Sequence, residues 1–191
     1  MSLSITGDAT ADQLLTDDPF ALLVGMLLDQ QIAMETAFAG PAKIHERVGT
    51  IDPTEIAAQE PDAFEAVFRQ TPAVHRYPGS MASRVQALAA TVRDEWDGDA
   101  AAIWTRDSPT GSEVLKRLRA LPGFGEQKAK IFLALLGKQC GFDGAGWREA
   151  AGDYGRPGHR SVADITSPES LTKVREHKRE QKAAAKAAKK A

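Results

Sequence analysis

Residues 113–136 read EVLKRLRALPGFGEQKAKIFLALL, and this stretch decides the fold. Apolar residues recur at helical spacing over 113–120, and again over 126–136. Between them, residues 121–125 (LPGFG) hold a proline and two glycines, which end one helix and let the chain turn sharply. The sequence therefore predicts two helices joined by a tight turn.

The turn of this hairpin is a candidate anion site. A helix that starts directly after Gly125 presents unpaired backbone N–H groups and the positive end of its dipole to the turn. Glycine at 123 and 125 lets a phosphate approach closely, and Lys128 and Lys130 follow within the first turns. A glycine that ends a helix is common in any helical protein, so a purely structural turn is the alternative.

The rest of the chain also predicts helices rather than strands. Polar residues followed by proline, as in Asp18-Pro19, Asp52-Pro53 and Ser167-Pro168, are typical of helix starts. Alanine-rich stretches and few β-branched runs indicate an all-α fold. Besides the hairpin, we expect helices over Pro19–Gln30, Met34–Val48, 53–59, 61–69, Ser80–Trp96 and Trp147–Ala151, and one from Pro168 toward the C-terminus.

Cysteine and histidine usage excludes several kinds of site. Cys140 is the only cysteine, so an intramolecular disulfide, a thiolate zinc site and an iron-sulfur cluster held by four cysteines are excluded. The four histidines are scattered without acidic residues at ligand spacing. We therefore expect no metal and no cofactor. The chain shows neither a secretory leader nor a stretch that could span a bilayer, so we expect a cytoplasmic protein without membrane contact.

The charge is divided unevenly along the chain. Residues 171–191 hold eight Lys/Arg against two Glu, which leaves 16 basic and 24 acidic residues in 1–170. This pattern predicts one helical domain over 1–170 and a basic tail over 171–191, either helical or disordered. From Gln181 on there is no apolar residue larger than alanine, so we expect this end to fray or detach. The tail can contact a polyanion or act as a solubilising extension.

Two motifs in order resemble the helix-hairpin-helix DNA-glycosylase superfamily (HhH-GPD), and most closely an uncharacterised actinobacterial branch of it. Residues 19–31 (PFALLVGMLLDQQ) resemble the first core helix of the family and the glutamine-bearing turn after it, and 121–125 resemble its hairpin. This resemblance implies a two-lobed helical bundle with double-stranded DNA across the cleft and a base extruded into it.

The resemblance also implies which residues contact DNA. Gln31, Gln30 and Met34 would approach the base pocket, although the glutamines could form a solvated helix end and Met34 could belong to the core. Trp147 could stack on a base or pin the glycine-rich loop before it. The backbone contacts would come from Gly123, Phe124, Gly125, Gln127 and Lys128.

The catalytic assignment depends on one carboxylate. Glycosidic cleavage builds positive charge on the sugar, which a carboxylate stabilises. Asp143, 18 residues after Gly125, is near the family's spacing for that residue but lacks its Val-Asp-Thr-His context, so it is either the catalytic acid or an ordinary loop aspartate. Asp153 and Asp164 are farther along and fit the spacing less well. The position of the family's Schiff-base lysine holds Gln127 here, which argues against lyase activity.

Two functions follow from these observations. The chain is expected to be a nucleoid-associated base-excision repair protein, as a monofunctional DNA N-glycosylase that removes a damaged base. The alternative is a non-catalytic DNA-binding relative that has lost the carboxylate. The sequence indicates neither the lesion nor the oligomeric state.

Overall fold

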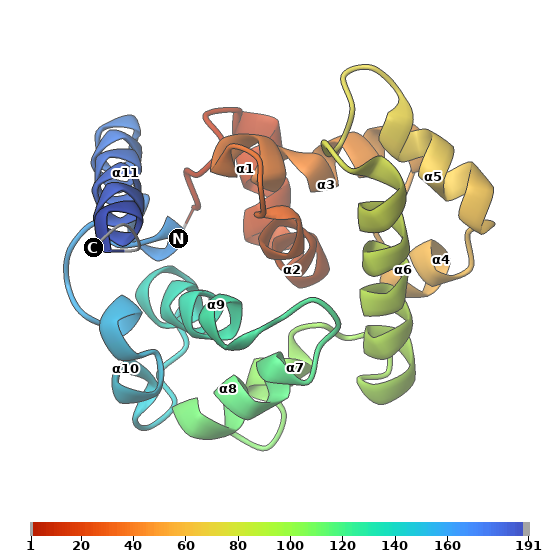
Figure 1. Ribbon diagram of the computed structural model, residues 1–191. Coiled ribbons are helices and arrows are strands. Elements are labelled where there is room, and N and C mark those ends of the chain that lie inside the picture. The colour runs from red at the N-terminus through yellow and green to blue at the C-terminus, as the bar shows by residue number, and fades with distance from the viewer. Residues whose placement is uncertain (1, 189–191) are drawn as a thin grey trace.

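A computed structural model describes residues 2–188, and within this range the chain is helical with no strand (Figure 1). The all-α prediction is therefore confirmed. In chain order the elements are α1 (Ala9–Asp17), α2 (Pro19–Leu28), α3 (Met34–Val48), α4 (Pro53–Ala57), α5 (Pro61–Arg69), α6 (Pro78–Glu95), α7 (Ala102–Thr105), α8 (Gly111–Arg119), α9 (Glu126–Gln139), α10 (Trp147–Ala150), the short 3-10 helices η1 (Gly152–Gly155) and η2 (Val162–Asp164), and α11 (Pro168–Ala188).

The helices form two groups. Helices α1 to α6 pack on one another, and α7 to α10 pack together with η1 and η2. Residues 96–101 connect the groups, and α11 returns from η2 to lie beside the first group (Figure 1). This arrangement agrees with the expected two-lobed bundle. None of the described helices is long and apolar enough to cross a lipid bilayer.

Helix α2 forms the centre of the core. The Asp18 carboxylate accepts from the Ala21 N–H at 2.8 Å, and Pro19 occupies the first turn, which together fix the helix start. Residues 20–28 are all buried. A Cβ at Gly25 would lie 2.7 Å from the Phe38 ring, so glycine lets α3 pack closely on α2.

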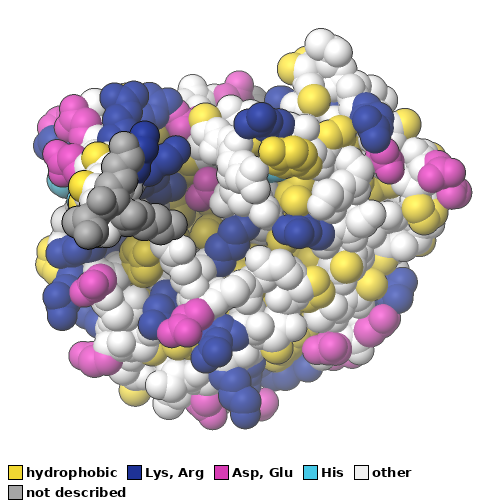
Figure 2. All heavy atoms as spheres, viewed as in Figure 1, with side chains coloured by type: hydrophobic (Ala, Val, Ile, Leu, Met, Phe, Trp, Pro, Cys, Tyr) yellow, Lys and Arg dark blue, Asp and Glu magenta, His cyan; other side chains and the backbone are white. Residues whose placement is uncertain are grey.

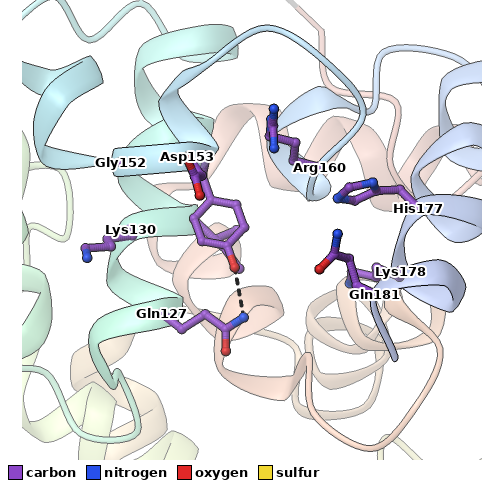
Figure 3. Close-up of a pocket in the computed structure, with 10 residues that line it drawn as sticks. Gln127, Lys130, Gly152, Asp153, Arg160, His177, Lys178 and Gln181 are labelled. Carbon is purple, nitrogen blue, oxygen red and sulfur yellow. Dashed lines mark hydrogen bonds between the residues drawn. The ribbon is translucent and has the colours of Figure 1, made fainter. Parts of the chain in front are cut away.

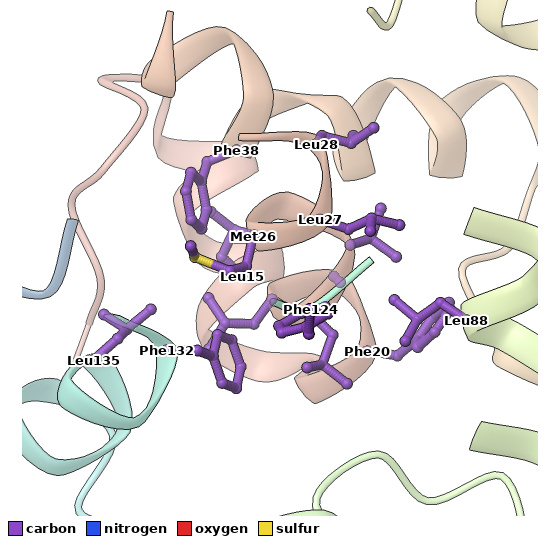
Figure 4. Close-up of a cluster of buried hydrophobic side chains, with 14 of the residues drawn as sticks. Leu15, Phe20, Met26, Leu27, Leu28, Phe38, Leu88, Phe124, Phe132 and Leu135 are labelled. Carbon is purple, nitrogen blue, oxygen red and sulfur yellow. The ribbon is translucent and has the colours of Figure 1, made fainter. Parts of the chain in front are cut away.

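The hairpin helices pack against α2 from the other group. In Figure 4 the side chains of Phe124 and Phe132 lie beside those of α2. Their rings meet edge to face with centroids 6.0 Å apart, and both are buried. A capping box between Thr110 and Glu113 starts α8. The hairpin is thus held rigidly to the core.

Some predicted bounds differ from the structure. Helix α2 ends at Leu28 rather than Gln30, because the backbone leaves the helical region at Asp29 (φ −71°, ψ 72°). Helix α9 continues to Gln139 rather than Leu136. The short helices α1 and α7 were not predicted, since they are mixed in polarity and too short for a clear period.

The glycine-rich segment between α9 and α10 is pinned by Trp147. This side chain is only 5% exposed, and a Cβ at Gly137 would overlap its ring. The Gly111 N–H also donates to the Ala145 carbonyl at 2.8 Å. Of the two roles considered for Trp147, the structure supports the pinning one.

Helix α11 carries the basic tail. Val174 is buried and anchors its first half, while the side chains from Gln181 on are exposed. The backbone stays helical to Ala188, so the predicted fraying is not observed in the described residues, while the exposed side chains from Gln181 on agree with an end that does not dock against the core. Lys189 and Lys190, two of the eight basic tail residues, lie outside them.

Candidate functional site

The two hairpin glycines have different surroundings. Gly123 has φ 79°, and a Cβ there would overlap the Leu27 side chain, so both its backbone and its packing require glycine. Gly125 has an ordinary φ of −72°, and a Cβ there would meet nothing within 4 Å. The space in front of Gly125 is therefore open to an approaching ligand.

The start of α9 leaves its first N–H groups available. Gly125 is the N-cap and supplies no side chain, and the first hydrogen bond inside the helix runs from the Ala129 N–H to the Gly125 carbonyl at 3.0 Å. The N–H groups of residues 126–128 thus point out of the helix end. Together with the open space at Gly125, they form a site suited to a phosphate.

The side chains predicted to contact DNA around this turn make contacts within the protein. The Phe124 side chain is buried in the core. The Gln127 amide donates to the Tyr154 hydroxyl at 2.8 Å, and Lys128 donates to the Leu27 carbonyl at 2.5 Å. Burial lowers the pKa of Lys128 to about 8, although Asp29 opposes this shift. Any contact with an anion is therefore left mainly to the backbone N–H groups.

The turn between α2 and α3 lies near the same helix end. The Gln30 amide donates to the Leu27 carbonyl at 3.0 Å and accepts from the Arg84 guanidinium at 3.2 Å, so this side chain is held inward. Gln31 is exposed, and its left-handed backbone is rarely adopted by a residue other than glycine. The turn thus exposes Gln31 more than the half-buried Gln30.

His75 ties this turn to the loop before α6. The Tyr77 N–H donates to Nδ1 at 3.0 Å, so the ring proton lies on Nε2, which donates to the Gln30 carbonyl at 3.0 Å. Burial lowers the pKa of His75 below its usual value, and the ring is neutral. Tyr77 is 42% exposed and is the one large apolar side chain among the described residues that is exposed. His75 thereby links the backbone beside Gln31 to the backbone of Tyr77.

A cavity of about 580 Å³ opens beside the first turns of α9 (Figure 3). Its walls come from α9, from η1 and the loop after it, and from α11. In Figure 3, His177 and Gln181 project from α11 toward the ring that accepts the hydrogen bond from Gln127. The lining residues are Gln127, Lys130, Ile131, Gly152, Asp153, Tyr154, Arg160, His177, Lys178 and Gln181.

Ion pairs hold α11 as one wall of this cavity. Arg175 pairs with Glu35 at the start of α3, and the Lys178 ammonium lies 3.7 Å from an Asp29 oxygen and 3.7 Å from the Met34 sulfur. Met34 is buried and borders the cavity through Lys178 rather than lining it. Figure 2 shows Lys and Arg side chains gathered over the part of the surface that α11 occupies in Figure 1.

The three candidate carboxylates occupy different environments. Asp143 is exposed beyond the far end of α9, and a 14-residue helix separates this end from Gly125, about 20 Å away. Asp164 is 7% exposed and paired with Lys138 at 2.6 Å, which is a structural role. Asp153 lines the cavity. Of the three, Asp153 shares a site with Gln127.

Most of the cavity wall has no recognisable pattern in the sequence. Tyr154, Arg160, His177 and Gln181 lie in an aperiodic loop or on the predicted tail, where no spacing pattern indicated a shared site. Arg84, which contacts Gln30, could have been found from the sequence, because it is a basic residue outside the apolar face of α6. No group of three or more His, Cys, Asp or Glu side chains within residues 2–188 is arranged to hold a metal ion.

One comparison with known proteins identifies a family. The family model described as "HhH-GPD superfamily base excision DNA repair protein" matches residues 24–191, which includes the hairpin and every residue of the cavity. No curated protein and no solved structure gives a significant match.

Proposed function

Because the chain belongs to the HhH-GPD superfamily of base excision DNA repair proteins, we propose that it binds duplex DNA and removes a damaged base as a monofunctional N-glycosylase. One observation carries this proposal. The open helix end at Gly125 lies two residues from Gln127, whose side chain lines the cavity. A phosphate bound at the start of α9 would place its nucleotide beside the cavity.

DNA binding is assigned to two surfaces. The N–H groups at the start of α9 bind a backbone phosphate, which positions the duplex without reading its sequence. Gln31 and Tyr77, both exposed and linked through His75, contact the duplex where the base leaves the stack. An aromatic side chain there can replace part of the lost stacking.

The cavity is assigned as the site of the extruded base. Its volume of about 580 Å³ lies within the range of about 300–1,000 Å³ typical of small-molecule sites. Cleavage breaks the bond between the sugar C1′ and the base nitrogen. The bonding electrons leave with the base, which takes up a proton, while water adds to C1′ and gives its proton to a carboxylate.

Asp153 is the carboxylate that we assign to this step. It lines the cavity, whereas Asp143, the candidate favoured by sequence spacing, lies at the other end of α9. Strand cleavage through a Schiff base is disfavoured, because Gln127 has no amine and the Lys128 ammonium is held on the Leu27 carbonyl.

A specific observation favours a second candidate, a non-catalytic DNA-binding protein. The Asp153 side chain is 69% exposed and lies 3.1 Å from Arg156, so its charge is partly neutralised and solvated. A carboxylate in that environment stabilises positive charge less well than a buried one.

The two functions are separated by a cleavage assay on duplexes with single alkylated, oxidised or deaminated bases. The proposed function predicts free base and abasic sites, with strand breaks only after alkali. Duplex binding without base release from any substrate would support the non-catalytic candidate. Absence of duplex binding would contradict both.

A further inference from the structure

We propose that the cavity selects neutral bases rich in carbonyl oxygens, as deaminated and oxidised bases are, over bases that carry a positive charge from N-alkylation. This inference rests on the proposed function, because it takes the cavity as the site of the extruded base. It follows from the hydrogen-bonding groups and the charges that line the wall.

Several polar groups of the wall can donate a hydrogen bond to a ligand. The Tyr154 hydroxyl accepts from the Gln127 amide, which leaves its own proton free to donate to a ligand. The Gln181 amide and the His177 imidazole project from α11 toward this hydroxyl (Figure 3). A base with two or more carbonyl oxygens supplies the acceptors that these donors lack.

Arg160 adds a positive charge to the wall. Its Nε atom is buried and has no hydrogen-bond partner among the described residues. Because Nε has almost no accessible surface, a ligand in the cavity would meet the rest of the guanidinium, from which a carbonyl oxygen would accept a charge-assisted hydrogen bond. Lys178 adds a second cation, 3.7 Å from the nearest Asp29 oxygen.

Little in the wall would compensate a cationic base. Among the described residues, Asp153 is the one carboxylate of the wall, and it pairs with Arg156 at 3.1 Å. Tyr154 is the one Phe, Tyr or Trp that these residues contribute to the wall, so a cationic base would find few aromatic faces. An alkylated purinium would therefore face Arg160 and Lys178 with unfavourable electrostatic energy.

Binding to uncleaved duplexes tests this preference separately from catalysis. Each duplex carries one 2′-fluoroarabino nucleotide, whose fluorine slows glycosidic cleavage, with uracil, cationic 7-methylguanine or unmodified cytosine. Affinity is measured by fluorescence anisotropy at one fixed salt concentration. We expect tighter binding of the uracil duplex than of the cytosine duplex, and no gain for 7-methylguanine.

Two variants locate the preference in the cavity. Arg160→Gln should reduce the preference for the carbonyl-rich base about tenfold, as the loss of a charge-assisted hydrogen bond predicts. Arg179→Gln is the control, since it removes the same charge from an exposed position on α11 outside the cavity. It should weaken all duplexes equally.

Gln181→Glu tests the sign of the effect at an exposed helical position where folding is not at risk. The added carboxylate should weaken binding of the carbonyl-rich base and strengthen that of 7-methylguanine. Duplex binding with a preference for 7-methylguanine, or with a preference that Arg160→Gln and Gln181→Glu leave unchanged, would overturn this inference alone. Absence of any duplex binding would instead overturn the proposed function.

Discussion

The Lys128 ammonium donates a hydrogen bond to the backbone carbonyl of Leu27 at 2.5 Å, across 101 residues of sequence. Leu27 lies in the last turn of α2, where carbonyl groups lack partners within the helix, and Lys128 lies in the first turn of α9. This contact joins the hairpin to the central core helix. It therefore fixes the open helix end at Gly125 relative to Gln31.

Replacing Lys128 should destabilise the fold in a pH-dependent way. Lys128→Met keeps the aliphatic stem but removes the Lys128 donor and leaves the Leu27 carbonyl with the Gln30 amide, which should cost about 1 kcal/mol in the free energy of unfolding. The pKa of Lys128 is about 8 in the folded protein, against an ordinary value of 10.5, so the unfolded chain binds more protons between these values. The wild-type free energy of unfolding should thus rise, relative to Lys128→Met, from pH 8 to pH 10.

Urea unfolding at several pH values measures this difference. Lys130→Met is the matched control, because its partner Glu126 lies on the surface and its loss should cost little. A difference between wild type and Lys128→Met that is constant across pH 8–10 would contradict the assignment.

The two hairpin glycines should separate stability from DNA binding. Gly123→Ala forces a left-handed backbone and an overlap with Leu27, and the backbone alone should cost about 1–2 kcal/mol of stability. Gly125→Ala meets open space and should leave the melting temperature unchanged. Gly125→Val should also fold but should lower duplex affinity about tenfold, or ~1.4 kcal/mol, by keeping a phosphate away. An unchanged affinity in folded Gly125→Val would exclude the hairpin as the DNA contact.

His75 should make the fold sensitive to mild acid. Burial lowers its pKa in the folded protein below the usual 6.5, so the unfolded chain takes up a proton first as the pH falls. The free energy of unfolding should be unaffected by His75 above pH 7 and should decrease below about pH 6.5. His75→Asn should remove this decrease, while His45→Asn in the same lobe should retain it. Denaturant unfolding at pH 5, 6 and 7 tests both, and an equal acid loss in His75→Asn would refute the prediction.

Asp153 should control the rate of base release. Asp153→Asn keeps the shape but removes the charge, so single-turnover release should slow at least about 100-fold, with duplex affinity unchanged or slightly higher. Asp143→Asn is the comparison at the exposed loop favoured by sequence spacing, and it should keep most of the activity. The reverse pattern would return the catalytic role to Asp143. Borohydride trapping of a covalent complex would instead point to a lysine nucleophile such as Lys128.

The end of α11 should contribute to affinity through charge alone. Ending the chain at Gln181 removes Lys182, Lys186, Lys189 and Lys190 and leaves the cavity wall and the buried Val174 in place. Each lost phosphate contact should flatten the slope of log affinity against log salt by about 0.9. Equal slopes for the shortened and full chains would show that this segment is a solubilising extension.

The sequence by itself determined most of the longer helices and the hairpin, because both depend on local chemistry. Asp18-Pro19 starts α2. The proline and glycines of residues 121–125 form the turn between the two hairpin helices, and helical spacing marks the buried face of each helix. Residues 24–191 also carry the family pattern. The sequence further indicated Gly125 as a ligand site, since the availability of N–H groups at a helix start depends on neighbouring residues only.

The cavity, in contrast, was decided by tertiary structure. Gln127, Tyr154, Arg160 and His177 come from a helix end, an aperiodic loop and the basic tail, and only the packing of α11 onto η2 and α3 brings them together. The direction of a side chain also depends on its neighbours in space, which is why Lys128 faces Leu27 rather than solvent. Distance along the chain likewise does not give the direction in which a loop leaves α9, so spacing alone did not place Asp143 relative to the cavity.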